Sequence, residues 1–241
     1  MKRNYKVIDD QIQKLKDKGL TFKNEEMARK IILRENYYNI TEGYENVFID
    51  LKSSSQNHQI YEEFTYFEEL YATYQFDRNL KELILDYMNR LEINIKSYVA
   101  YAFSNQYGDI DYLKRENFDS NKIYDNEFNK LQTQIHEQLT RNFQNKNSGI
   151  KKFYDANHKI PLWILVQVFT FGTITNFYCL MKIEQKQEVA QAFQISPYHL
   201  GTYLKMLNIV RNICAHGDIL FNIRLHYKIK ARDCNYHELL A

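Results

Sequence analysis

Apolar residues recur at three- and four-residue steps along most of this chain, which is the pattern of amphipathic helices. The strongest run lies between Phe64 and Phe103, where no glycine or proline interrupts the spacing. Its apolar positions are Phe76, Leu80, Leu83, Ile84, Tyr87, Met88, Leu91, Ile95, Tyr98 and Val99. We expect one long helix here, or two helices joined near residues 75–77, that forms the spine of a helical bundle.

Two short helices are predicted before this segment. Ile8, Ile12 and Leu15 stand at helical spacing, and Gly19 follows them as a stop signal. Asn24 can then cap a second helix, because its side chain can accept a hydrogen bond from a free backbone N–H in the first turn. The sequence therefore predicts two N-terminal helices ahead of the long one.

The connections around these helices are more polar. Residues 36–43 read as a turn-rich connection, and residues 104–160 form a polar mid-chain insertion with a helix at about 128–143. Pro161 can open the next helix at its first position, since its missing N–H has no partner there in any case, and Gly172 is expected to break that helix.

The last predicted helix is the best delimited one. Ser196 and Pro197 are an N-cap and a first-turn proline, and Gly217 is a C-terminal stop, so a helix is expected over about 197–216. Its apolar stripe comprises Leu200, Tyr203, Leu204, Leu207, Val210 and Cys214. Other apolar residues lie on the far side, so we expect burial nearly all round, except for a strip formed by Lys205, Asn208, Asn212 and His216.

Arg211 falls near the middle of the apolar stripe of this helix. A buried guanidinium without a partner costs several kcal/mol, so Arg211 must pair with an acid or face an anionic ligand. His216 lies at the helix C-terminus, where the helix dipole favours the protonated ring. An arginine that binds phosphate and a histidine that exchanges protons suit phosphodiester cleavage. The alternative is a core ion pair for Arg211, to Asp77, Asp86 or Glu92, with His216 as an ordinary helix cap.

A second candidate for RNA contact is the basic segment between residues 142 and 152. It contains Lys146, Lys151 and Lys152, with Phe153 and Tyr154 beside them, and cations next to aromatic rings suit RNA backbone and base contacts. A solvated loop with ordinary lysines is the competing interpretation. The polar strip of the C-terminal helix adds two further candidates for RNA binding, Lys205 and Asn208.

Composition agrees with an all-helical class. With 241 residues, 44% of them hydrophobic, the chain can bury a substantial core as one large domain or one and a half. Only 7 glycines and 2 prolines argue against an all-β fold with many tight turns. The 20 tyrosines and 15 phenylalanines predict a core rich in aromatic packing. A formal net charge of +2 means that any RNA-binding surface must be a local patch.

Several classes of function are disfavoured by what the sequence lacks. Its 3 cysteines form no CxxC pair and no even-numbered disulfide framework, which indicates a reducing, cytoplasmic setting. The basic N-terminus is followed by Asp9 and Asp10 rather than an apolar run, so no signal peptide is expected. Polar residues interrupt the apolar stretch 160–181, so we expect buried helices and no membrane association. Scattered histidines and the absence of a glycine-rich phosphate loop predict no metal and no cofactor.

The segment Arg211-Asn-Ile-Cys-Ala-His216 resembles the Arg-Asn-x-x-x-His signature of the HEPN-superfamily ribonucleases. More specifically, nearly the whole chain is similar to the AbiD/AbiF-like abortive-infection family of bacteriophage-resistance proteins. The markers of the resemblance, in chain order, are Asn36-Tyr-Tyr-Asn-Ile, Gly43-Tyr44, Phe76-Asp-Arg-Asn-Leu80, Arg90-Leu-Glu92, Pro161-Leu-Trp163, Phe171-Gly-Thr173, Cys214-Ala-His216 and Leu220-Phe-Asn222.

The resemblance implies a single HEPN-like helical domain over residues 1–241, with an N-terminal extension at 1–60 and a bundle at 64–217. It also implies a metal-independent endoribonuclease, in which the 2′-OH of the RNA attacks the adjacent phosphorus. His216 would then be the general base or acid, Arg211 would stabilise phosphate charge, and Asn212 would orient either group. Glu92 and Asp77 are candidates to support Arg211.

Two partners follow from the same resemblance. Because HEPN sites usually combine two motifs and this chain has one, a homodimer is implied. RNA is implied as substrate, within a role in phage defence. The alternative is a non-catalytic protein that binds, or is guided by, a structured small noncoding RNA. A protein-interaction bundle, with Arg211 as a core ion pair, is the third hypothesis.

Overall fold

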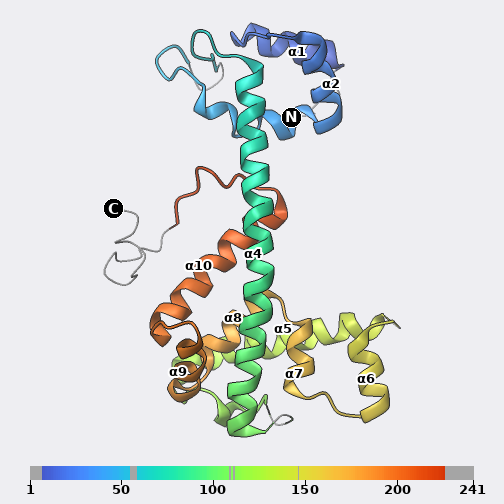
Figure 1. Ribbon diagram of the computed structural model, residues 1–241, viewed down its shortest axis with the longest axis vertical. Helices are drawn as coiled ribbons and strands as arrows, with labels where there is room; N and C mark the ends of the chain where they lie inside the picture. Colours follow the sequence, from blue (N-terminus) through green and yellow to red (C-terminus); the bar gives the residue numbers. More distant parts are fainter. Residues whose placement is uncertain (1–6, 55–58, 109, 111, 146, 226–241) are drawn as a thin grey trace. The chain divides into compact units, whose positions relative to one another are not determined.

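The computed structural model describes residues 7–54, 59–108, 110, 112–145 and 147–225. Regular structure in these residues is helical, with only isolated β-bridges beside it, which confirms the all-α class (Figure 1). The α-helices are α1 (Ile8–Asp17), α2 (Glu25–Glu35), α3 (Tyr37–Thr41), α4 (Phe67–Tyr107), α5 (Asp125–Gln144), α6 (Gly149–Asn157), α7 (Leu162–Leu165), α8 (Phe171–Leu180), α9 (Ile183–Ala192) and α10 (Pro197–His216). Short 3-10 helices are η1 (Glu45–Val47), η2 (Arg115–Asn117), η3 (Lys122–Tyr124) and η4 (Val166–Val168).

The first two helices form where their sequence signals predict them. Ile12 and Leu15 of α1 are buried, and Gly19 follows with a φ of 92°, a conformation that glycine adopts at little cost. Asn24 caps α2 by accepting a hydrogen bond from the N–H of Met27 at 2.9 Å. Local chemistry therefore sets both helix boundaries.

The long apolar run forms one continuous helix, α4, of 41 residues, rather than two joined helices. Ile95 and Val99 are fully buried as expected. Four of the positions assigned to the apolar face are instead exposed, namely Phe76, Leu83, Tyr87 and Tyr98. Apolar residues on α4 thus extend beyond the stripe that its neighbours cover.

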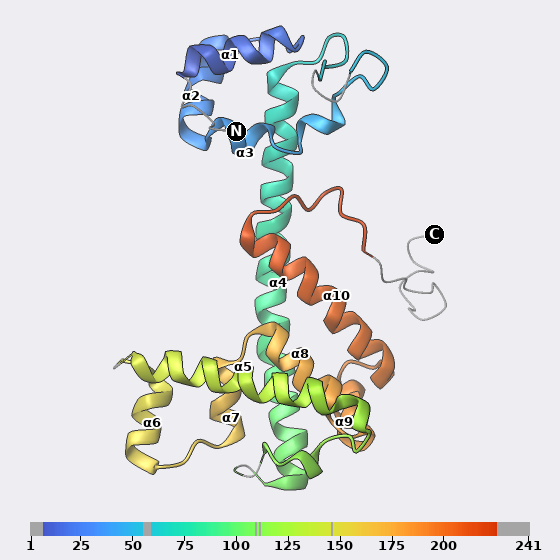
Figure 2. The ribbon, with the colours of Figure 1, turned by 180° about the vertical axis from the view of Figure 1, so that it is seen from behind.

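The contacts within the chain divide it into two compact units, each with its own apolar core. What we call the N-terminal unit holds the described part of residues 1–83 and residues 216–223, and its core includes Leu15, Ile40 and Leu70. What we call the bundle unit holds residues 84–215, with a core that is rich in aromatic rings. Within the bundle unit, α5 packs against α6 and α8 (Figure 2).

Two segments predicted to be irregular are helical. Residues 37–41 form α3, because Asn36 ends α2 at a φ of 72° and then caps α3 by accepting from the N–H of Tyr38. The end of the basic segment lies in α6, which is anchored by the buried side chain of Ile150. Both helices depend on burial against distant residues, which local sequence patterns do not contain.

The helix after Pro161 also differs from the prediction. Pro161 is the residue before α7 rather than its first residue, and the chain breaks near Phe169, not at Gly172. Thr170 begins α8 by accepting a hydrogen bond from the N–H of Thr173, so Gly172 lies inside the first turn. None of the helices in the described ranges combines the length and apolar character needed to cross a bilayer.

Candidate functional site

The C-terminal helix α10 carries the motif, and its ends are set by the predicted signals. Ser196 Oγ accepts a hydrogen bond from the N–H of His199 at 3.2 Å, and Pro197 is the first helical residue. Gly217 follows the last residue with a φ of 81°, the left-handed conformation of a C-terminal stop. The expectation of burial nearly all round is wrong, since Ile209 is 39% exposed.

The three motif residues differ in their surroundings. Asn212 and His216 are exposed, and their four-residue spacing places them on the same face of α10. Arg211 is half-buried, and its Nη1 donates to Asn212 Oδ1 at 3.4 Å. Within the described ranges, Arg211 makes no ion pair.

The acids of the bundle unit that were candidates for Arg211 have other partners. Glu92 Oε1 accepts from Lys96 Nζ at 2.6 Å, and Asp86 Oδ2 accepts from Arg90 Nη2 at 2.8 Å. Each pair joins residues four apart on α4, which is the common spacing of helical ion pairs. The structure therefore brings neither Glu92 nor Asp86 to Arg211, since each forms its own ion pair on α4.

Asp77 has a different role from the predicted one. Its side chain is 0% exposed and lies in the N-terminal unit. Oδ1 accepts from the backbone N–H groups of Leu220 at 3.0 Å and Phe221 at 2.7 Å. Oδ2 accepts from the hydroxyl of Tyr44 at 2.7 Å and lies 3.1 Å from Lys81 Nζ. Four donors thus fill the acceptor capacity of one carboxylate, which fixes the segment directly after His216.

Neighbouring groups support the same segment. Burial, and then the hydrogen bond to Asp77, raise the pKa of the Tyr44 hydroxyl, so it remains a donor. The Tyr44 ring stacks on Phe221 with a centroid distance of 5.9 Å. Lys81 Nζ also donates to the backbone oxygen of Asp218 at 3.1 Å. Sequence reasoning missed this cluster, although a lone acid in an otherwise apolar helical stripe was its visible signal.

The described lysines of the basic segment differ in whether they form an ion pair. Lys151 pairs with Asp155 at 2.9 Å, whereas Lys152 is exposed on α6. Lys146 lies outside the described residues. The Phe153 ring meets the Trp163 ring edge-on, with centroids 5.8 Å apart. Lys152 is thus the cation of this segment that remains open to an RNA backbone.

The two remaining candidates lie on α10 within the bundle unit. Lys205 borders a pocket of about 640 Å³ that is also lined by Lys130, Lys186 and Cys179. Burial lowers the pKa of Lys186 and raises the pKa of the Cys179 thiol. The pocket therefore gathers three lysines around a thiol that stays protonated.

Asn208, by contrast, lies against Gly172 of α8, where a Cβ would come within 3.3 Å of its Oδ1. Its side chain thus occupies the space that this glycine leaves open. Among the described residues, no group of three or more His, Cys, Asp or Glu side chains is arranged to hold a metal ion.

Fold and site together define an all-helical protein with a polar Arg-Asn-x-x-x-His motif at the end of its last described helix. Comparison with protein-family models identifies the family of the chain. The model described as "Abi-like protein" matches residues 30–222, and the chain belongs to this family of abortive-infection proteins, which indicates phage defence. Searches of curated proteins and of solved structures give no match.

Proposed function

We propose that this Abi-like protein is an effector of abortive infection that cleaves RNA without a metal ion. Arg211, Asn212 and His216 are the proposed catalytic residues. The observation that carries the proposal is the state of these side chains. Asn212 and His216 are exposed at the end of α10, and Arg211 has no acidic partner in the described ranges. The spacing of the three residues is that of the HEPN ribonucleases, and the AbiD/AbiF-like proteins are the subgroup that the chain resembles.

The reaction follows from these groups. The 2′-OH of one ribose attacks the adjacent phosphorus, and the bond from phosphorus to the 5′ oxygen of the next nucleotide breaks. His216 takes the proton of the 2′-OH as base, or gives a proton to the leaving 5′ oxygen as acid. Arg211 stabilises the negative charge on the phosphate, and Asn212 orients the histidine or the phosphate. The products carry a 2′,3′-cyclic phosphate and a 5′-OH.

A homodimer completes this chemistry. The step needs both a base and an acid, and each chain carries one motif. Two copies of α10 that meet at their exposed polar ends would supply two histidines to one phosphate. We propose that the protein acts in the cytoplasm and that its substrate is cytoplasmic RNA.

The residues after His216 support its position. Asp77 fixes the backbone of Leu220 and Phe221, and Lys81 binds the carbonyl of Asp218. Histidine placement matters for acid–base catalysis, because proton transfer requires hydrogen-bond distance. We therefore assign Asp77 as a positioning residue rather than a catalytic one.

The test compares cleavage of total RNA by the wild-type protein and by His216→Ala, both in EDTA. Loss of the proton-transfer group should lower the rate by at least about 100-fold. His136→Ala, which removes an exposed histidine of α5, is the matched control and should cut at the wild-type rate. Cyclic phosphate ends on the products identify the mechanism. Equal cleavage by wild type and His216→Ala would refute the assignment.

A second candidate function is stable binding of a structured small noncoding RNA without cleavage. The observation that favours it is the presence of cations away from the motif, at Lys152 and around the pocket of Lys130, Lys186 and Lys205. RNA would then co-purify with the protein and persist in Arg211→Ala and His216→Ala. RNA that is lost in both variants would exclude this function.

A further inference from the structure

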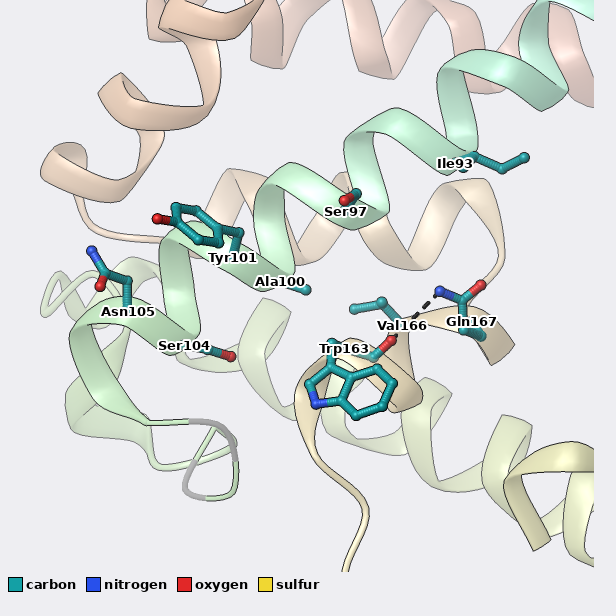
Figure 3. Close-up of a pocket in the computed structure, with 9 residues that line it drawn as sticks. All are labelled: Ile93, Ser97, Ala100, Tyr101, Ser104, Asn105, Trp163, Val166 and Gln167. Carbon is teal, nitrogen blue, oxygen red and sulfur yellow. Dashed lines mark hydrogen bonds between the residues drawn. The ribbon is translucent and has the colours of Figure 1, made fainter. Parts of the chain in front are cut away.

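A second pocket lies entirely within the bundle unit, between the C-terminal part of α4 and the segment of α7 and η4. Its volume is about 650 Å³, within the range of roughly 300–1,000 Å³ that is usual for ligand sites. Figure 3 shows the side chains that α4 and the α7–η4 segment contribute. Six of them matter for the argument: Tyr101, Ser104, Asn105, Trp163, Val166 and Gln167. No charged side chain belongs to the lining, so the pocket favours a neutral group.

Aromatic rings at the pocket are open to solvent. Trp163 is 53% exposed and Tyr101 is 69% exposed, although residues of this size and character are usually covered. Exposed indole and phenol rings offer flat surfaces on which another planar group can stack. The rings therefore predict an aromatic or heteroaromatic ligand.

Polar groups at the same pocket have spare hydrogen-bonding capacity. Ser104 Oγ is buried and has no hydrogen-bond partner in the described structure, which is costly unless a ligand supplies one. The Gln167 amide makes one long bond, 3.5 Å, to the carbonyl of Trp163, which leaves its oxygen open. Asn105 also lines the pocket, but its amide points away from Trp163 (Figure 3). Amides present donor and acceptor side by side, as the edge of a nucleobase does.

The helix that contacts Trp163 also carries a cation. Trp163 contacts Phe153 of α6, and the residue before Phe153 is the exposed Lys152. A nucleotide is neutral and planar at its base and negative at its phosphate, so it matches a neutral aromatic pocket with a lysine on the adjoining helix. A peptide side chain or a lipid does not combine a neutral planar group with a neighbouring phosphate in this way.

We propose that this pocket binds one unpaired nucleobase of single-stranded RNA, stacked on Trp163 and hydrogen-bonded by Ser104 and Gln167. The proposal rests on RNA being the substrate class of the proposed function, and it assigns the recognition of that RNA to a separate surface. Base pairing hides the hydrogen-bonding edge and stacking occupies both faces, so the pocket selects loops and unpaired segments over duplexes.

Trp163 is the chain's 1 tryptophan, so its emission reports directly on the pocket. The full-length protein is titrated with a short unstructured 2′-O-methyl oligoribonucleotide, which lacks the attacking hydroxyl and cannot be cut. Stacking should quench the emission to a saturating limit. A duplex of the same sequence, or a strand in which the bases are replaced by abasic sites, should leave it unchanged. Quenching as strong with the abasic strand, or none with any strand, overturns the proposal.

Variants give an independent readout through binding of a labelled strand. Trp163→Ala should weaken binding about 5- to 150-fold, the range expected for loss of one base–aromatic stack. Trp163→Phe, which keeps a ring, should retain most of the affinity. Tyr87→Ala removes an equally exposed ring of α4, 63% exposed and outside the pocket, and should bind as wild type. Unchanged affinity in Trp163→Ala refutes the pocket.

Gln167→Ala keeps the test decisive if Trp163→Ala fails to fold, since its side chain is exposed and its loss spares the core. It should weaken binding while Trp163 remains as reporter, and unchanged binding refutes its role. The outcomes also separate the two proposals. Base-dependent quenching without any RNA cleavage refutes the nuclease alone. Cleavage that depends on His216, with Trp163 emission indifferent to RNA, refutes the pocket alone.

Discussion

Asp77→Ala tests whether one buried carboxylate holds the segment that follows His216. The substitution removes the acceptor for two backbone N–H groups, one hydroxyl and one ammonium. All four donors lie in the N-terminal unit, so the effect belongs to that unit.

The magnitude follows from the donors left behind. Each hydrogen bond to a charged group contributes about 1.5–3 kcal/mol net, and the contributions do not add fully because the four donors share one acceptor. Removal of one partner from a buried ion pair costs about 3–5 kcal/mol, and Lys81 would lose its only carboxylate within the described part of the chain. We therefore expect Asp77→Ala to lower the free energy of unfolding by about 3–5 kcal/mol, a large share of the about 5–15 kcal/mol that a domain usually has.

Urea denaturation followed by circular dichroism measures this loss. Glu82→Ala is the matched control, because Glu82 is an exposed acid of the same helix and unit, paired with Arg78 at 3.3 Å. An exposed pair of this kind contributes only about 0.3–0.5 kcal/mol. Hydrogen exchange gives a local readout, since the amides of Leu220 and Phe221 should lose their protection in Asp77→Ala. A loss of under about 0.5 kcal/mol, or retained protection, would refute the reasoning.

Three further outcomes are expected. Gly43→Ala should destabilise the N-terminal unit by about 1–2 kcal/mol, because Gly43 has a φ of 80° and a Cβ there would overlap Ile219; a wild-type melting temperature would contradict this. Burial lowers the pKa of Lys186, so between that pKa and the ordinary 10.5 the unfolded state binds more protons and stability rises with pH. Lys186→Met should remove this rise and stabilise the protein at neutral pH, as thermal melts across pH will show. Burial raises the pKa of the Cys179 thiol above the ordinary 9.0, so its alkylation by iodoacetamide, followed by peptide mass spectrometry, should have a midpoint above pH 9.0 rather than at or below it.

Much of the fold was predictable where the determinants are local. The boundaries of α2 and α10 depend on Asn24, Ser196 and Gly217, each of which acts within one helical turn. α3 and α6 were not predictable in the same way. Each is short, and each buries few side chains, Ile40 and Thr41 in α3 and Ile150 in α6. The energy that forms such helices comes from tertiary contacts, which periodicity does not reveal.

In the candidate site, too, local features were predictable from the sequence and long-range contacts were not. The exposed face shared by Asn212 and His216 follows from their spacing on a helix. For Arg211, the sequence left two partners open, an acidic side chain or an anionic ligand. Glu92 and Asp86 are excluded as that partner only by the structure, in which they pair with Lys96 and Arg90. The two backbone N–H groups that Asp77 accepts from lie 143 and 144 residues away along the chain, so no local pattern could identify them.

The Asp77 cluster explains why the markers of the family resemblance are scattered yet ordered. Gly43-Tyr44, the segment around Asp77, and Leu220-Phe221 are far apart in the sequence, but their groups meet at one carboxylate. Tyr44 must be a donor, Asp77 must be an acceptor, and Gly43 must leave room for Ile219. A change in one member leaves the others unsatisfied in a buried place. These markers therefore constitute a structural signature that secures the chain just beyond His216, and they are separate from the residues of α10 that we propose as catalytic. A related chain that keeps the cluster and loses His216 should fold normally and cut no RNA, which is the combination expected of a family member that only binds it.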